Sequence, residues 1–315
     1  MRVVFMGTPD FAVPSLEALH AAGHEIAAVF TQPDRPKGRG YALVPPPVKV
    51  LAERLSIPVH QPATLKDGAA QRILEALTPD AVVVVAYGRI LPEALLSIPR
   101  LGCVCAHASL LPKYRGAGPI QWAVLNGERE TGITTMLMDK GIDTGDILLA
   151  ERTPLLPDEA AGELEARLSQ IAGPLLCETL TGLEDGSLRP RPQQGKATYA
   201  PMLKKELSPL DFSRQAEQLY NQVRGLQPWP VAHFSLDGKR VRVLRASVCA
   251  GVSGASPGAV LEAGSSLIVA CGGGAAIELI KIQPEGGRVM SAAEYLRGHP
   301  IPLGAILSHA LSPYQ

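Results

Sequence analysis

The 315-residue sequence is poor in aromatic residues and lacks a long hydrophobic run. Phe, Trp and Tyr together make up 4% of the chain, so its core must be mostly aliphatic. No apolar run reaches the roughly 18 residues that a membrane-spanning helix needs. The apolar stretch at the N-terminus breaks at Gly7, which is too early for the core of a signal peptide. We therefore expect a cytoplasmic protein.

The sequence also lacks the cysteine spacing of a metal site or a disulfide scaffold. It has five cysteines, an odd number, and the pair Cys103 and Cys105 has the spacing C-x-C and not C-x-x-C. These features indicate reduced thiols in a reducing compartment. No metal ion is expected.

The chain has no net charge, which argues against a generally basic nucleic-acid-binding protein. The two halves nevertheless differ. Residues 1–190 carry 17 Lys and Arg against 22 Asp and Glu, a net of −5, whereas residues 191–315 carry 13 against 8, a net of +5. This asymmetry suits an acidic catalytic domain joined to a module that binds a polyanion.

Short apolar runs alternate with helical patterns over the first 150 residues. Continuous runs rich in β-branched residues, alternating with helices, indicate a parallel sheet covered on both faces. The sequence therefore predicts a doubly wound, mostly parallel α/β domain. The strands are expected at Val3–Met6, Ile26–Phe30 and Ala81–Ala86, and helices around Pro14, Val48–Leu55 and Ala69–Leu77.

The pattern changes near residue 190, where a proline-rich polar stretch indicates a linker. A helix is expected at Ser213–Gly225, followed by short alternating strands. Asp237-Gly238 is a strong hairpin signal, and glycines 272–274 separate two later strands. These features predict a small OB-like β-barrel. The expected domains are thus residues 1–189, a linker at 190–208, and the barrel at 209–315.

His107 and Asp143 are candidates for acid–base chemistry. His107 ends a predicted strand and leads into a loop broken by proline and glycine, the place where open α/β sheets bind ligands. Asp143 lies in a second loop rich in glycine, and a carboxylate can orient a histidine and raise its basicity. Taken singly, such a histidine is more often structural and such an aspartate a turn former. Gly7 is followed by Thr-Pro-Asp, so the dinucleotide-binding pattern G-x-G-x-x-G of an oxidoreductase is missing.

The combined pattern resembles the folate-dependent formyltransferases. It reads H-x-SLLP-x-x-RG-x-x-P from His107, followed by D-x-G-x-DTGD from Asp139. The loop at residues 32–40 and the Pro-Trp-Pro segment at 228–230 are similar to the branch that acts on a tRNA, and the similarity covers nearly the whole chain. It implies an enzyme of translation initiation, expected to be a monomer. That enzyme would transfer the formyl group of 10-formyltetrahydrofolate to the α-amino group of methionyl-initiator tRNA.

The resemblance also implies roles for individual residues. His107 matches the family histidine that shuttles the proton leaving the amine, and Asp143 matches the aspartate that orients this histidine. The strand that ends near Ala86-Tyr87-Gly88 is expected to help wall the pterin. The segment that would hold the folate is Ser109, Leu110, Leu111 and Pro112.

Cys105 departs from the family pattern, which has asparagine two residues before the histidine. That asparagine donates a hydrogen bond to the developing oxyanion, and a thiol is a much weaker donor. Loss of one such donor typically costs about 10²–10³ in rate. We expect a weak enzyme, an engineered variant, or an enzyme compensated by a backbone N–H; a covalent formyl-thioester at Cys105 is the less favoured alternative.

Two basic segments are candidates for binding RNA. Arg35, Lys37 and Arg39 lie in the 32–40 loop, where the resemblance implies contact with the tRNA acceptor end; a solvated surface loop is the alternative. Four further cations lie on the second-domain hairpin: Lys239, Arg240, Arg242 and Arg245. Arg240 and Arg242 are expected to point to one face of the strand and Arg245 to the other. Trp229 is expected to be a core or linker anchor and not a platform for base stacking.

Two other functions stay open at this point. A formyltransferase acting on an amino sugar nucleotide or a purine precursor would have the same site. A catalytically impaired tRNA-binding protein is the other alternative, because Cys105 replaces the family asparagine.

Overall fold

The computed structural model describes residues 1–37 and 42–308. They belong to two compact units. Unit 1 comprises residues 1–119, 130–154 and 165–200, and unit 2 comprises residues 120–129, 155–164 and 201 onward. Residues 190–200 were expected to be part of a linker, but they pack within unit 1. The predicted boundaries of the two domains stay a prediction. In the described ranges, no helix is both long and apolar enough to cross a membrane.

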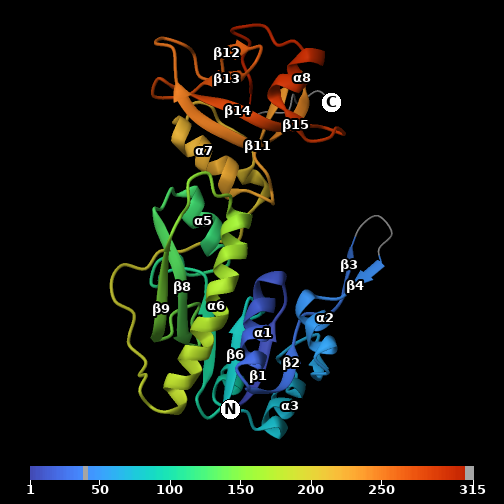
Figure 1. Cartoon of the computed structure of the whole chain (residues 1–315), viewed down its shortest axis with the longest axis vertical. Coiled ribbons are helices and arrows are strands. Elements are labelled where there is room, and N and C mark those ends of the chain that lie inside the picture. Colours follow the sequence, from blue (N-terminus) through green and yellow to red (C-terminus); the bar gives the residue numbers. More distant parts are fainter. Residues whose placement is uncertain (38–41, 309–315) are drawn as a thin grey trace. The chain divides into compact units, whose positions relative to one another are not determined.

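Unit 1 is built on a seven-stranded sheet (Figure 1). Its order is β5-β2-β1-β6-β7-β8-β9, parallel from β5 to β7 and antiparallel at β8 and β9. The doubly wound, mostly parallel fold class is therefore confirmed. The strands are β1 (Arg2–Gly7), β2 (Glu25–Phe30), β5 (Val59–His60), β6 (Ala81–Val85), β7 (Cys103–His107), β8 (Glu130–Leu137) and β9 (Ile147–Pro154).

The strands at the centre of this sheet follow the expected apolar runs. All five residues of β6 are buried, as are the last five of β1, because helices cover such a sheet on both faces. The sequence prediction missed β9 and the longest helix, α6. The helical elements of unit 1 are η1 (Asp10–Ala12), α1 (Val13–Ala21), α2 (Pro47–Arg54), α3 (Ala69–Leu77), α4 (Glu93–Leu96) and most of α6 (Ala161–Glu184).

Helices α1 and α6 pack closely together beside the sheet (Figure 1). A Cβ atom on Gly173 of α6 would lie 2.8 Å from the Cβ of Ala18 on α1, so only glycine permits this approach. Helix α1 has Pro14 in its first turn, where proline costs no helical hydrogen bond. Gly23 follows the helix with a φ of +82° and turns the chain into β2.

Unit 2 contains an antiparallel sheet in the order β10-β11-β14-β13-β12, with β15 paired to β14. Residues 306 and 308 bridge to Ala259 before β12 and to Ser235 on β10, and so link the two edges of the sheet. The predicted small β-barrel domain is thus confirmed, in the form of an antiparallel half-barrel. Its elements are α5 (Pro119–Leu125), η2 (Lys205–Leu207), α7 (Ala216–Gly225), β10 (His233–Leu236), β11 (Lys239–Ala250), β12 (Val260–Ala263), β13 (Leu267–Ala270), β14 (Ala275–Pro284), β15 (Met290–Ser291) and α8 (Ala292–Gly298).

The predicted hairpin between β10 and β11 is confirmed, but the expected orientation of Arg245 is wrong. Asp237 and Gly238 have φ values of +49° and +73°, as a two-residue turn of type I′ requires. The register of β11 against β14 is irregular on both sides of Arg245. Ala246 takes the place on the core face that simple alternation would give to Arg245, which stays exposed.

Candidate active site

His107 is the last residue of β7 and is nearly buried, with 7% of its surface exposed. Its Nε2 lies 2.8 Å from the carbonyl oxygen of Tyr114. A carbonyl only accepts, so Nε2 carries the proton and donates to it. In the neutral ring, the lone pair therefore lies on Nδ1. The Tyr114 carbonyl thus selects which nitrogen can act as a base.

Asp143 faces this free nitrogen from the loop between β8 and β9. Its Oδ2 lies 3.7 Å from Nδ1 of His107 and accepts a hydrogen bond of 2.7 Å from the backbone N–H of Gly116. The separation is too long for a hydrogen bond but short enough for strong attraction once the ring is charged. The structure therefore brings the two predicted side chains together, while their catalytic roles stay a prediction.

Gln193 connects the loop of Asp143 with the loop that follows β7. Its Nε2 donates to the backbone carbonyls of Asp143, at 2.9 Å, and Gly145, at 2.8 Å. Its Oε1 accepts from Nε and Nη2 of Arg115, at 3.2 and 2.7 Å. Asp143 has a φ of +52°, an uncommon conformation for a residue with a side chain, and these bonds help to hold it. Sequence reasoning missed Gln193, because nothing local marks it.

Residues 198–200 form hydrogen bonds with the loop that follows β7. The Tyr114 N–H donates to Oγ1 of Thr198 at 2.9 Å, and the Arg115 N–H donates to the Thr198 carbonyl at 2.9 Å. Gly116, with a φ of +111°, has no room for a side chain, because a Cβ there would lie 2.7 Å from the Ala200 carbonyl oxygen. We name residues 190–200 the strap. The strap holds the backbone that positions both His107 and Asp143.

Cys105 lies two residues before His107 on β7 and is partly buried. Burial raises the pKa of its thiol above the ordinary value, and the negative charge of Asp143 raises that pKa further. The thiolate is the reactive form of cysteine, so this environment disfavours a nucleophilic role. The structure gives no support to the formyl-thioester alternative.

The segment expected to hold the folate, residues 109–112, lies in a loop that hydrogen bonds stabilise. The Oγ of Ser109 donates to the Lys113 carbonyl at 2.6 Å, and Oγ1 of Thr134 donates to the Ser109 carbonyl at 2.6 Å. Ser109 and Leu111 are buried, whereas Leu110 and Pro112 keep part of their surface accessible. Contact of these four residues with folate stays a prediction.

Polar groups also collect where β1, β2 and β6 end, at the same edge of the sheet as His107. The Tyr87 carbonyl accepts from Oγ1 of Thr8 at 3.0 Å and from Nε2 of Gln32 at 3.1 Å. The Tyr87 hydroxyl and Oγ1 of Thr31 are buried and have no hydrogen-bond partner within the described residues. Thr31 directly follows β2, so its unpaired hydroxyl lies near this edge and fits a polar ligand, whereas the Tyr87 ring packs in an apolar core cluster.

The basic loop begins as a small hairpin that the sequence did not predict. Strands β3 (Arg35–Lys37) and β4 (Ala42–Val44) pair antiparallel, with Arg35 exposed. At its base, Nζ of Lys49 lies 2.9 Å from Oδ2 of Asp34. Arg39 lies outside the described residues. Contact of Arg35, Lys37 and Arg39 with tRNA stays a prediction.

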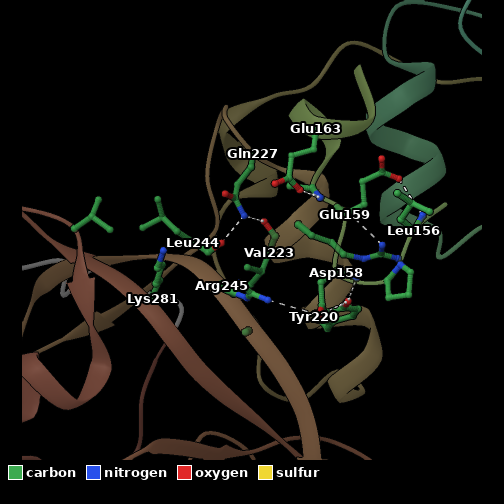
Figure 2. A pocket seen from close by; sticks show the side chains of 15 residues that line it. Leu156, Asp158, Glu159, Glu163, Tyr220, Val223, Gln227, Leu244, Arg245 and Lys281 are labelled. Atoms are coloured by element: carbon green, nitrogen blue, oxygen red, sulfur yellow. Dashed lines mark hydrogen bonds and ion pairs between the residues drawn. The ribbon is translucent and has the colours of Figure 1, made fainter. Parts of the chain in front are cut away.

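A cavity of about 660 Å³ in unit 2 contains none of the residues predicted for catalysis or folate binding, and of the four hairpin cations only Arg245 lines it (Figure 2). Its lining includes three acidic and three basic side chains, so their formal charges balance. The acidic groups are already bonded. Asp158 accepts from the Tyr220 hydroxyl at 2.6 Å, Glu159 from the Leu156 N–H at 3.0 Å, and Glu163 from the Ala160 N–H at 2.8 Å. These contacts fasten the segment before α6.

No group of three or more His, Cys, Asp or Glu side chains is placed to hold a metal ion in the part of the chain that the structure describes. The expectation of a metal-free reaction stays a prediction.

Comparison with known proteins adds independent information. The family model for formyl transferase matches residues 1–180, and that for the formyl transferase C-terminal domain matches residues 202–300. A methionyl-tRNA formyltransferase from Pelotomaculum thermopropionicum is 49% identical over 313 residues, which cover 99% of this chain and 100% of that protein.

Two solved structures are similar in fold. Methionyl-tRNA formyltransferase from Clostridium thermocellum has a TM-score of 0.54 at 20% identity, covering 78% of this chain and 93% of its own. HypX from Aquifex aeolicus in complex with tetrahydrofolic acid has a TM-score of 0.64 at 17% identity; the match covers 94% of this chain and 47% of HypX, so this chain spans about half of that protein. The family models and the sequence identity over nearly the full length establish that the chain belongs to the methionyl-tRNA formyltransferase family.

Proposed function

We propose that this protein transfers the formyl group of 10-formyltetrahydrofolate to the α-amino group of methionyl-initiator tRNA. One geometric observation supports the proton transfer that this reaction needs. Nδ1 of His107 has its lone pair free and lies 3.7 Å from the carboxylate of Asp143 at the carboxyl edge of the sheet. Family membership supports the choice of substrates.

In this mechanism, Nδ1 of His107 accepts the proton that the amine loses as it attacks the formyl carbon. The ring becomes positively charged, and the nearby carboxylate of Asp143 stabilises that charge. The Tyr114 carbonyl continues to accept from Nε2–H in both protonation states, so the ring does not need to turn. Collapse of the tetrahedral intermediate then breaks the bond between the formyl carbon and N10 of the folate, N10 takes the proton from His107, and tetrahydrofolate leaves.

The oxygen of the formyl group gains negative charge during attack and needs a donor. Cys105 is the side chain at the position of the family asparagine, and its protonated thiol is a weak donor. We propose that Cys105 contributes less to the rate than an amide would. We therefore infer slower turnover than an asparagine at this position would give.

The folate supplies the formyl carbon, and two features of unit 1 fit such a ligand. The unpaired Thr31 Oγ1 suits a heterocycle rich in hydrogen-bonding groups. Leu110 and Pro112 offer accessible apolar surface on the loop after β7. We propose that Ser109, with its side chain bonded to Lys113, shapes this loop and does not touch the ligand itself.

For the tRNA, we propose contacts from the 32–40 loop and from the basic hairpin of unit 2. Arg35 and Arg242 are exposed and available for phosphates. A cytoplasmic monomer remains our expectation.

The decisive experiment offers the purified protein 10-formyltetrahydrofolate with three acceptors in parallel. These are methionyl-initiator tRNA, an amino sugar nucleotide and glycinamide ribonucleotide. We expect formylation of the tRNA alone, and a fall in kcat of at least about 10²-fold in Asp143→Asn. Formylation of a small acceptor at a comparable rate, with no reaction on the tRNA, would reject the proposed substrate.

A further inference from the structure

A small cavity of about 220 Å³ lies in unit 2 between the segment after η2 and the first hairpin of the sheet. Backbone bonds fix its frame, since the His233 N–H donates to the Ser208 carbonyl at 2.9 Å and His233 pairs with Arg242 across the hairpin. Cavities for whole ligands usually measure about 300–1,000 Å³. This one therefore suits a single group of a larger molecule. Its lining residues are Lys205, Ser208, Trp229, Pro230, Val231, His233, Arg240 and Arg242.

The lining is strongly basic. It contains the three cations Lys205, Arg240 and Arg242 and no acidic side chain, in contrast to the balanced charges of the cavity in Figure 2. Burial lowers the pKa of His233, and the positive charges of the two arginines lower it further. The local potential is therefore positive, and the cavity favours an anion.

Arg240 has hydrogen-bonding capacity that the fold leaves unused. Its Nε is buried and has no hydrogen-bond partner among the described residues, and its side chain makes no ion pair there. Glu285 accepts from the backbone N–H of Arg240 at 3.4 Å and lines a neighbouring cavity together with Arg240 and Arg242, but its carboxylate forms no ion pair with either guanidinium among the described residues. A guanidinium presents a planar set of donors that suits the oxygens of a phosphate.

Trp229 supplies a different kind of surface at the same cavity. Half of its area is exposed, so it is not a core anchor; the other expected role, that of a linker anchor, stays a prediction. Prolines on both sides restrict its backbone. An exposed aromatic ring next to phosphate-binding cations is the combination that binds nucleotides, because the base stacks while the phosphate is neutralised.

We infer that this cavity is a nucleotide site, with the phosphate held by Arg240, Arg242 and Lys205 and the base stacked on Trp229. That the nucleotide belongs to the tRNA substrate rests on the proposed function. A free nucleotide has the same chemistry and would occupy the same groups.

The sequence offers a direct probe, because Trp122 and Trp229 are its only tryptophans. In a Trp122→Phe background, emission reports on Trp229 alone. We expect AMP to quench this emission saturably, whereas adenosine and inorganic phosphate at equal concentration have little effect. Arg240→Gln should weaken AMP binding at least tenfold. The matched control is Lys239→Gln, which removes a charge from the same hairpin outside the cavity and should leave binding within about twofold.

Equal effects of Arg240→Gln and Lys239→Gln, or no quenching by AMP, would overturn the site. Quenching by inorganic phosphate as strong as that by AMP would also overturn it, since the base would then play no part. A thermal unfolding midpoint unchanged from the parent protein checks that each variant is folded.

A second measurement identifies the source of the nucleotide. In the formylation assay, Trp229→Leu and Arg240→Gln should raise KM for the tRNA at least fivefold with unchanged kcat, if the bound nucleotide is part of the tRNA. An unchanged KM together with AMP binding would assign the site to a free nucleotide. Absence of formylation in the parent protein would reject the proposed function, while the fluorescence titration would still decide on the cavity.

Discussion

Replacing Gln193 with methionine tests whether the strap positions the catalytic pair. Methionine keeps the approximate size of the side chain but can neither donate to the carbonyls of Asp143 and Gly145 nor accept from Arg115 in the same way. The two bonds to the Asp143 loop contribute a net of about 1–3 kcal/mol. If that loop shifts, the carboxylate moves away from His107 and kcat should fall about 5- to 150-fold.

Steady-state formylation kinetics measure this effect against two controls. Gln194→Met makes the same change one residue along, at an exposed position, and should leave kcat unchanged. KM for the folate should also change little in Gln193→Met, because a positioning residue acts on the reacting groups through Asp143.

A double-mutant cycle with Asp143→Asn gives the sharpest test. If Gln193 acts through the Asp143 carboxylate, adding Gln193→Met to Asp143→Asn should cost less than about threefold. An equal fall in kcat in both backgrounds would refute the reasoning and leave Gln193 with a purely structural role.

Three further predictions concern other residues. Cys105→Asn should raise kcat at least tenfold, since an amide is the better donor to the developing oxyanion, and an unchanged kcat would show that the thiol is no handicap. In the folded protein at pH 8, Cys177 should react with a thiol reagent well before Cys105, whose pKa is raised by burial and by the charge of Asp143; mass spectrometry of labelled peptides gives the order. The Arg2 N–H and the Arg100 guanidinium lower the pKa of Asp80, so its carboxylate stabilises the fold above the ordinary value of about 3.9 and this stabilisation is lost as pH falls through the folded-state pKa. The melting temperature of Asp80→Asn should therefore lie below that of the parent at pH 7, and the difference should shrink as the pH falls below about 3.9.

Elements with a strong local pattern were predictable from the sequence. The run of alanine and valine at 81–85 gave the central strand, and Asp237-Gly238 gave a hairpin because both residues tolerate left-handed backbone. His107 could be placed at a strand end for the same reason, since an apolar run stops there. Such features depend on neighbours in the chain.

Features fixed by distant contacts were not predictable. The strap is polar and rich in proline, so it was expected to be a linker, and its order comes from bonds such as that between Gln193 and Asp143. Arg245 was placed on the wrong face because alternation fails where β11 pairs irregularly with β14. Helix α6 was missed, although it spans Ala161–Glu184. In each case the deciding interactions are invisible to a local pattern.

The position of the strap in the chain has a consequence for protein synthesis. Gln193 follows Asp143 by 50 residues, and every strand of the seven-stranded sheet has left the ribosome before it. A nascent chain that has completed α6 contains the whole sheet and the helix that packs beside it, yet the glutamine does not join its two loops. Termination between Glu184 and Gln193 would thus leave the histidine and the aspartate poorly aligned, so such products would not compete as formylating enzymes.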